Sequence, residues 1–281
     1  MRIAIASGKG GTGKTTVAVN LARLLSRHAP VQYVDCDVEE PNGHLFLHPV
    51  ITQSVPVTIP VPAVDDKRCT RCGACSRLCQ YHAIAALPTR TLVFPELCHG
   101  CGGCARVCPE KAITEVGRPI GVVERGMAGA VAFVHGRLNV GEAMSPPLIR
   151  AVQTYADPRA AVILDAPPGT SCPVIAAIRP CDAVVLVTEP TAFGLHDLTL
   201  AVEMVRALNR PMGVVINRAD MGDARVERYC AREGVPIWGC IPHDRRIAEA
   251  YARGEMAVDA LPDTIPVFDQ VIAAIKSEVP A

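Results

Sequence analysis

The stretch GKGGTGKTT, Gly8 to Thr16, constrains the fold most because of what flanks it. It follows the apolar run Arg2–Ser7, which predicts a buried β-strand, and precedes TVAVNLARLLSRH, which has the periodicity of an amphipathic helix. Strand, GxxxxGKT and helix in this order bind phosphates: glycines let backbone N–H groups approach, Lys14 supplies a positive charge, and the Thr15 hydroxyl can ligate Mg²⁺. The sequence therefore predicts a nucleotide site, ATP with Mg²⁺, at Gly10, Gly11, Thr12, Gly13, Lys14, Thr15 and Thr16.

Further along the chain, strands and helices alternate. Apolar runs separated by segments of helical periodicity occur at 162–166, 183–187, 212–217 and 237–241. Further strands are expected at 120–123 and 131–135, and a helix at 146–155. Alternation of this length predicts an α/β fold with a mostly parallel sheet covered by helices on both faces.

Composition limits the partners that this chain can have. Lys plus Arg and Asp plus Glu number 28 each among 281 residues, so no net charge favours nucleic acid or an anionic membrane. No apolar run approaches the roughly 20 residues that span a bilayer, and no secretory leader is visible, so we expect a cytoplasmic protein. Thirteen cysteines in a reducing compartment are better explained as metal ligands than as disulfides.

Eight of these cysteines belong to a duplicated segment. CTRCGACSRLCQYHAI begins at Cys69 and CHGCGGCARVCPEKAI begins 29 residues later, at Cys98. The spacing C-x2-C-x2-C-x3-C is that of bacterial two-cluster ferredoxins, in which the fourth cysteine of each run ligates the other cluster. We therefore expect two 4Fe-4S clusters, one held by Cys69, Cys72, Cys75 and Cys108 and the other by Cys98, Cys101, Cys104 and Cys79.

Zinc is the alternative metal, since paired CxxC units also bind it. Eight thiolates in a repeated x2-x2-x3 pattern suit two cubanes better than tetrahedral zinc sites. The second run has the usual proline after its fourth cysteine, Pro109, whereas the first has Gln80, so the local turn there is less defined. The other five cysteines show no CxxC spacing and are expected to be mostly small buried residues, with Cys172, in GTSCPV, as the exception to watch.

The loop with two lysines, Lys9 and Lys14, resembles the deviant Walker A sequence of the MinD, ParA and Mrp superfamily of P-loop ATPases, which includes the nitrogenase iron protein. This resemblance implies that Lys9 reaches the phosphates of a partner subunit in an ATP-bound dimer, formed with a second copy or with a paralogous ATPase. VQYVDCDVEEPN resembles the first switch of that superfamily and implies that Asp37 lies beside the attacking water. AVILDAPPGT resembles its Walker B and second switch, with Asp165 holding Mg²⁺ through water.

The same resemblance places the adenine ring. VVINRAD puts Asn217 and the adjacent Arg218 at the base, and GCIPHD puts Pro242 near it. The C-terminal IPVFDQVIAAIKSEVPA has one lysine and lacks the basic face of a MinD membrane anchor.

Taken whole, the chain resembles MinD-superfamily ATPases that contain an inserted ferredoxin domain. We expect a discontinuous ATPase domain at 1–63 and 118–281 and a small α+β ferredoxin domain of the bacterial type at 64–117. The segment SVPVTIPVPAVDD before it is expected to be a β-like linker, because its prolines argue against a central strand.

The leading functional hypothesis is an Mg-dependent ATPase whose nucleotide state gates electron transfer through the two clusters to a redox partner. The insert follows the first switch, and switch ordering by nucleotide can move a neighbouring element. The alternative is an ATPase for iron–sulfur cluster assembly or delivery to an acceptor protein. Eight thiols argue against a labile carrier site, and the C-terminal CxxC of Mrp-type carriers is missing. A MinD-like or ParA-like positioning ATPase is the third hypothesis, disfavoured by the neutral charge.

Overall fold

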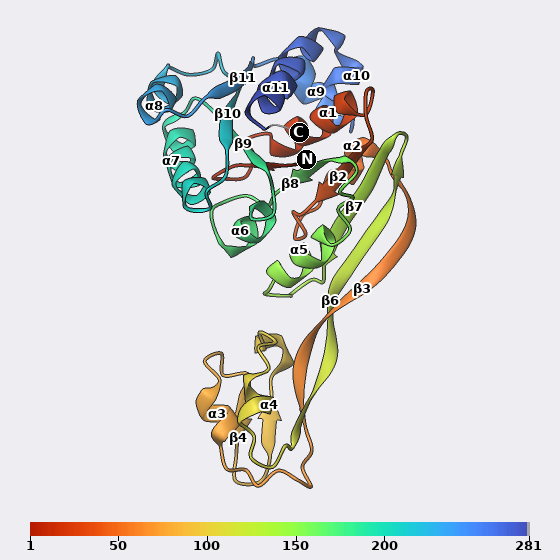
Figure 1. Cartoon of the computed structure of the whole chain (residues 1–281), viewed down its shortest axis with the longest axis vertical. Helices are drawn as coiled ribbons and strands as arrows, with labels where there is room; N and C mark the ends of the chain where they lie inside the picture. Colours follow the sequence, from red (N-terminus) through yellow and green to blue (C-terminus); the bar gives the residue numbers. More distant parts are fainter. Residues whose placement is uncertain (280–281) are drawn as a thin grey trace. The chain divides into compact units, whose positions relative to one another are not determined.

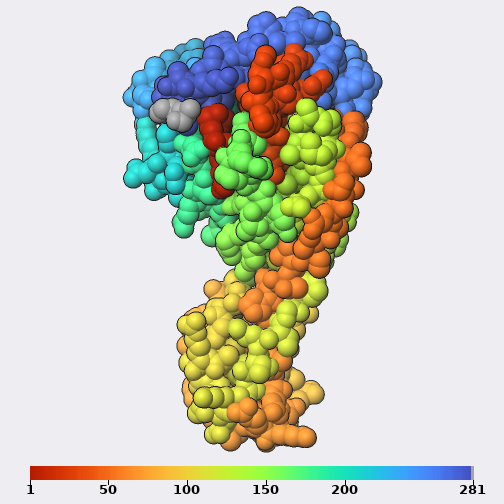
Figure 2. All heavy atoms as spheres, turned by 45° about the vertical axis from the view of Figure 1, so that its right-hand side comes forward, coloured from red at the N-terminus to blue at the C-terminus, as the bar shows by residue number. Residues whose placement is uncertain are grey.

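The computed structural model describes residues 1–279, and the chain separates into two compact units. The first unit contains residues 1–54, 123–137 and the described chain from 149 onward. The second contains Val55–Val122 and Leu138–Leu148. Figure 2 shows the residues around the cysteine runs, coloured yellow, packed as a body of their own. The domain boundaries predicted from the sequence remain predictions.

A nine-stranded sheet carries the fold, in the order β11-β10-β9-β1-β8-β2-β7-β6-β3. All pairings from β11 through to β7 are parallel, which confirms the predicted mostly parallel sheet. The two-residue connection between β6 and β7 makes these two strands antiparallel neighbours. The strands are β1 (Arg2–Ala6), β2 (Val31–Asp35), β3 (Val50–Val64), β6 (Ile113–Ala128), β7 (Val131–Leu138), β8 (Ala161–Asp165), β9 (Ala183–Thr188), β10 (Met212–Asn217) and β11 (Ile237–Ile241).

Helices cover both faces of the parallel part of this sheet. Figure 1 shows α1, α10 and α11 on one side of the strands and α6 and α7 on the other. The expected helix at 146–155 is α5, which ends slightly earlier. The helices outside the segment of the cysteine runs are α1 (Lys14–Leu25), α2 (His44–Leu47), α5 (Pro146–Gln153), α6 (Cys172–Ile178), α7 (Ala192–Ala207), α8 (Arg225–Glu233), α9 (Arg245–Ala252), α10 (Ala257–Ala260) and α11 (Ile265–Glu278), with a 3₁₀ turn at Pro262–Thr264.

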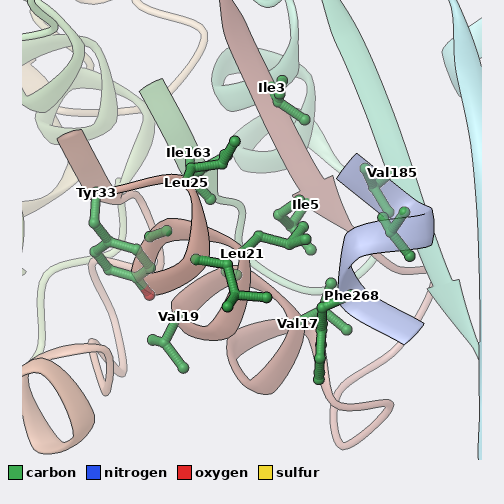
Figure 3. Close-up of a cluster of buried hydrophobic side chains, with 14 of the residues drawn as sticks. Ile3, Ile5, Val17, Val19, Leu21, Leu25, Tyr33, Ile163, Val185 and Phe268 are labelled. Carbon is green, nitrogen blue, oxygen red and sulfur yellow. The ribbon is translucent and has the colours of Figure 1, made fainter. Parts of the chain in front are cut away.

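The core that positions the phosphate loop lies between β1 and α1. Side chains of a strand alternate between its faces, so Ile3 and Ile5 point to the same side and meet Val17 and Leu21 of α1 (Figure 3). Phe268 of α11 belongs to the same buried cluster. Burying one such side chain stabilises the fold by about 1.5–3 kcal/mol. The loop between β1 and α1 is therefore held at both ends by packed elements.

The proline-containing segment 54–66, predicted as a β-like linker and not a central strand, lies largely in an edge strand. Residues Val50–Val64 form one continuous strand, β3, at the end of the sheet order, paired only with β6. An edge strand needs hydrogen bonds along one side alone, and this is why it accommodates the prolines Pro56, Pro60 and Pro62.

The second unit contains the same small arrangement of a cysteine run and a short helix twice. Its elements are α3 (Ala74–Leu78), β4 (Ile84–Ala86), β5 (Thr91–Val93), a 3₁₀ turn (Pro95–Leu97) and α4 (Gly103–Val107). The sequence repeat also appears in the backbone, because residues 29 apart share left-handed conformations: Arg71 with Gly100, Gly73 with Gly102 and His82 with Lys111. Gly73 and Gly102 each precede a short helix at φ near +70° (76° and 71°), where a residue with a Cβ would be strained.

A search of the helices in residues 1–279 finds none that is long and apolar enough to cross a membrane.

Candidate nucleotide site and candidate cluster pockets

A cavity of about 400 Å³ opens at the carboxyl ends of the parallel strands in the first unit. Ligands bind at this edge in open α/β sheets, where the strand order reverses, and here β1 lies between β8 and β9. The cavity is lined by Gly10, Gly11, Gly13, Lys14, Thr15, Thr16, Asp37, Glu40, Asn42, Pro168, Asn217, Arg218, Ile241, Pro242, His243, Asp244, Ile247, Ala248, Tyr251 and Phe268.

The structure brings most of the predicted nucleotide residues to this one cavity. The phosphate loop lies beside Asp37, and the predicted adenine residues Asn217, Arg218 and Pro242 line the same space. Three predicted residues do not line it: Lys9, Thr12 and Asp165. Thr12 and Asp165 are buried, whereas the side chain of Lys9 is one-third exposed, at 33%.

The phosphate loop owes its shape to close backbone packing. Gly13 has φ 93°, and a Cβ at this position would collide with the Asn217 amide nitrogen, so a larger residue is excluded. Asn217 Nδ2 donates to the Thr12 carbonyl at 2.9 Å, which ties the end of β10 to the loop. Arg218 is itself left-handed at φ 53° and donates its backbone N–H to Asn217 Oδ1. Asn217 therefore supports the loop in addition to lining the cavity.

Three carboxylates gather beneath the loop, at the ends of β2 and β8. Asp35 and Asp165 are register partners and are fully buried. Asp35 accepts the backbone N–H groups of Asp37 and Gly43, both at 3.1 Å, and Tyr33 Oη donates to Asp165 Oδ2 at 2.9 Å. Like charges and burial in this cluster disfavour ionisation.

The pKa values of these carboxyl groups reflect that crowding. Burial raises the pKa of Asp37 to about 6, with the Lys14 ammonium opposing the shift and Asp165 adding to it. Burial also raises the pKa of Asp165, again opposed by Lys14, and the pKa of Asp35 lies well above its ordinary value because of burial and the neighbouring Asp165. Lys14 is the nearby cation that opposes these shifts for Asp37 and Asp165.

This arrangement fits a divalent cation. Asp165 Oδ1 is buried without a hydrogen-bond partner among the described residues, so an acceptor is left over for a metal-bound water. The Thr15 hydroxyl donates to Asn42 Oδ1 at 2.9 Å, which leaves its lone pairs free for a metal ligand bond. Oxygen donors of this kind are those that Mg²⁺ prefers.

Several residues at the site were not predicted from the sequence, Asp35 and Glu189 among them. Asp35 was passed over in favour of Asp37, although its place as the last residue of a buried strand was a usable signal. Glu189 follows β9 and pairs with both Lys9, at 3.9 Å, and Arg218, at 2.7 Å. No local motif marks Glu189, because only the sheet topology brings the ends of β1, β9 and β10 together.

In the second unit the eight predicted thiols line two separate pockets. The first thiol set, Cys69, Cys72, Cys75 and Cys108, lines one pocket. The second thiol set, Cys79, Cys98, Cys101 and Cys104, lines the other. In each pocket three cysteines come from one run and the fourth from the other run, which is the crossed grouping expected for a two-cluster ferredoxin.

Hydrogen bonds to sulfur are present in both sets. Backbone N–H groups of Ala83 and Ala112 donate to Cys79 Sγ and Cys108 Sγ, each at 3.3 Å, and these two pairs are 29 residues apart. Gly100 donates to Cys98 Sγ at 3.4 Å. Backbone hydrogen bonds to sulfur of this kind fit cluster ligands. Across residues 1–279, no three His, Cys, Asp or Glu side chains form a group that could hold one metal ion.

The remaining cysteines divide by burial. Cys36, Cys181 and Cys230 are buried, as expected for small core residues, and burial raises the pKa of each thiol. Cys172, at the start of α6, is exposed, and so is Cys240 on β11, which was expected to be buried.

Comparison with known proteins places the nucleotide site in context. An uncharacterised protein of Methanocaldococcus jannaschii is 33% identical over 225 residues, covering 79% of this chain and 80% of its own length. A second uncharacterised protein of that organism is 29% identical over 91% of this chain and 90% of its own length. An iron-sulfur cluster carrier protein of Pyrococcus horikoshii is 26% identical over 89% of this chain and 76% of its own.

Solved structures show the same fold. The septum site-determining protein MinD of Pyrococcus horikoshii, complexed with Mg-ADP, matches with a TM-score of 0.61 at 20% identity, covering 98% of this chain and 95% of that one. A ParA family ATPase of Chlorobium tepidum matches with a TM-score of 0.60 at 15% identity, over 97% of each chain. Residues 3–258 match the CobQ/CobB/MinD/ParA nucleotide binding domain. Because this match covers most of the chain, the chain belongs to the CobQ/CobB/MinD/ParA nucleotide binding domain family.

Proposed function

We propose that this protein is an ATPase whose nucleotide state controls electron transfer through two 4Fe-4S clusters to a partner protein. The observation that carries the proposal is the grouping of eight thiols into two pockets of four, on a segment that follows the first switch in the chain. We propose 64–117 as the ferredoxin domain and 1–63 with 118–281 as the ATPase domain.

The first thiol set would hold one cluster and the second thiol set the other. When bound, such clusters supply one-electron redox chemistry, with potentials set by hydrogen bonds to sulfur and by solvent exposure. The chain provides these controls unequally. Thr91 Oγ1 lies 3.4 Å from Cys69 Sγ, whereas its counterpart 29 residues earlier, beside the second thiol set, is Pro62, which can offer no hydroxyl.

At the nucleotide end, the residues divide the work of phosphoryl transfer to water. Lys14 and the loop N–H groups bind the phosphates, while Thr15 and Asp165 hold Mg²⁺, the latter through water. Asp37 orients the attacking water, and its pKa of about 6 lets it accept a proton near neutral pH. Asn217, Arg218 and Pro242 would receive the adenine.

The first switch connects this chemistry to the second unit. Asn42 accepts from Thr15, and the next residue, Gly43, donates its N–H to Asp35. The chain then forms α2 and, two residues after it, enters β3, which runs from the first unit into the second. A change in the ligands of Thr15 therefore acts on the segment from which β3 departs.

We further propose an ATP-dependent dimer in which Lys9 contacts the partner's nucleotide. Lys9 lies at 3.9 Å from Glu189 and is partly exposed, outside its own cavity, so its side chain is accessible to a partner subunit. Two relatives of similar length in Methanocaldococcus jannaschii show that one organism carries two chains of this kind, which supports a paralogue as well as a second copy as partner.

The test is an EPR-monitored redox titration of anaerobically purified protein, with and without Mg-ATP, beside iron and sulfide analysis. We expect two 4Fe-4S signals whose potentials or spin coupling change with nucleotide. Clusters that are present but indifferent to Mg-ATP would contradict gating at the cluster, and absence of iron and sulfide would refute the cluster assignment.

Cluster assembly or delivery is the second candidate, because several relatives are named iron-sulfur cluster carrier proteins. The two functions differ in whether the iron stays on this chain or passes to an acceptor protein. Incubation with an apo-ferredoxin and Mg-ATP should leave the iron on this chain if it is an electron donor. Transfer of iron and sulfide to the acceptor would favour delivery instead.

A further inference from the structure

We propose that the surface beside the second thiol set is the docking face for the redox partner; this rests on the proposed cluster function. The duplication provides an internal comparison, because each position near one thiol set has a counterpart 29 residues away near the other. At four of these positions the residue around the second set is apolar or aromatic where its counterpart around the first is polar or charged: Phe94 for Asp65, Leu97 for Arg68, His99 for Thr70 and Tyr81 for Glu110. Leu78 does not follow this pattern, because its counterpart Val107 is apolar and 39% exposed.

The apolar residues are exposed to solvent. Phe94 is 41%, Leu97 51%, Tyr81 45% and Leu78 44% exposed. All four lie within four residues of Cys79 or Cys98, Leu78 and Tyr81 line the pocket of the second thiol set, and Phe94 donates its backbone N–H to the carbonyl of Ala83 in the same lining. Exposed apolar side chains gathered in this way are typical of an interaction site. We call Leu78, Tyr81, Phe94 and Leu97 the apolar patch.

Aromatic stacking fixes the patch against the thiols. The rings of Tyr81 and His99 stack with centroids 3.5 Å apart and an angle of 9° between planes. Both line the pocket of the second thiol set, whereas their counterparts Glu110 and Thr70 line the pocket of the first. The conjugated side chains therefore lie between the thiols and the solvent on one side of the domain only.

An open hollow of about 420 Å³ adjoins the same thiol set. Its wall includes the exposed Cys101, the backbone of Gly100 and Gly102, and the side chains of Arg106 and Glu115. A partner seated on the apolar patch can place a side chain in this hollow, directly beside a cluster ligand.

Charge indicates the chemistry of the partner. Glu96 and Glu115 are exposed and form no ion pair within residues 1–279, and the four thiolates of the set add negative charge. Arg106 supplies one opposing positive charge, and Arg118, near Glu96 and Cys98, is already paired with Glu142. The face therefore fits a redox protein with an apolar surface over its own centre and lysine or arginine residues around that surface.

Ferric cytochrome c, which has this chemistry, serves as the probe. The full-length protein is reduced with dithionite, excess reductant is removed, and one electron passes from the protein to ferric haem, giving ferrous haem. We compare wild type with Tyr81→Ser/Leu97→Ser and with the matched control Arg68→Ser/Glu110→Ser, which replaces the counterpart positions. Neither double variant changes the net charge.

We expect the patch variant to lower the second-order rate at least tenfold, and the control to change it less than twofold. Reduction of methyl viologen, which needs no docking face, should change less than twofold in all three proteins, and rising salt should slow the cytochrome reaction. Iron content and cluster potentials verify that each variant is intact. A second variant, Leu97→Arg, introduces the residue that the other half of the duplication carries at this position and should slow the reaction as well.

An equal loss in the control, or an unchanged rate in the patch variants, would overturn the proposal. So would loss of ATP-dependent dimerisation in the patch variant, since the face would then belong to a second copy. The cytochrome assay uses no nucleotide, so a docking effect in this assay would leave the inference standing even if the EPR titration showed no influence of Mg-ATP and the gating function failed.

Discussion

At the residue scale, Lys14 is the central charge of the nucleotide site. It is only 7% exposed, opposes the raised pKa values of Asp37 and Asp165, and lines the cavity proposed to bind the nucleotide. In the proposed function its ammonium acts on both the phosphates and the protein's own carboxylates.

We expect Lys14→Ala to abolish ATP binding, because the point charge for the phosphates is lost, while the iron and sulfide content stays unchanged. Fluorescent ATP binding and iron analysis on the same preparation test this. Lys276→Ala, on the last turn of α11, is a control of equal charge change away from the site. Simultaneous loss of nucleotide and iron would refute two independent binding modules.

Asp37 links pH to stability. Its folded pKa of about 6 lies above the ordinary value of 3.8, so its ionised form is disfavoured by folding, and the resulting cost is absent below pH 3.8 and complete above pH 6. Two pH units correspond to about 3 kcal/mol, which solvent screening of a half-buried group reduces to about 1–2 kcal/mol.

Asp37→Asn should therefore raise the melting temperature of the nucleotide-free protein at pH 8 by about 2–4 °C and abolish ATP hydrolysis. The gain should shrink as the pH falls through 6. Thermal melts at pH 5 and pH 8, with phosphate release measured in parallel, provide the check. A stabilisation that is the same at both pH values would mean that the carboxylate charge is not its cause.

At the scale of elements, the duplicated half-domains exchange their fourth thiols. This grouping can be tested by removing cysteines in pairs. Cys69→Ser/Cys108→Ser removes two thiols from the first set only, so we expect about four iron atoms per chain to remain. Cys69→Ser/Cys79→Ser removes two thiols from one sequence run but from different sets, so we expect nearly complete loss.

Iron and sulfide analysis of the two variants, with EPR of the remaining cluster, distinguishes these outcomes. Each variant loses two cysteines from the same domain, so general destabilisation affects both. If the run-based pair retained four iron atoms and the pocket-based pair none, each cluster would be held within one run and the crossed assignment would be wrong.

The elements also show where sequence reasoning succeeds and where it stops. The phosphate loop and the cysteine runs are local patterns whose chemistry fixes spacing, so their residues could be named before the fold was known. Glu189 has no such pattern, since only parallel pairing of β1 with β9 and of β9 with β10 brings it to Lys9 and Arg218. The prolines of β3 argued against a central strand, in agreement with its edge position, but they gave no sign that the strand runs unbroken from Val50 to Val64.

At the scale of the whole molecule, Lys9 and Lys14 should separate assembly from binding. We expect Lys9→Ala to retain ATP binding within about threefold and to lose ATP-dependent dimerisation, because its own cavity does not include it. Light scattering with a non-hydrolysable ATP analogue measures the assembly. Lys67→Ala, an exposed lysine of the second unit, is the charge-matched control. A Lys9→Ala protein that still dimerises with ATP would contradict a role in the partner's site.

The prolines of β3 affect whether copies of this chain can pair edge to edge at high concentration. These prolines, Pro56, Pro60 and Pro62, all occupy even positions, and the N–H groups of alternate residues in a strand point to the same side. The missing donors therefore all fall on one side, the side away from β6, the one strand with which β3 pairs. An incoming strand would find too few donors there to continue the sheet, so a long border that could otherwise seed fibrils is protected by its own sequence.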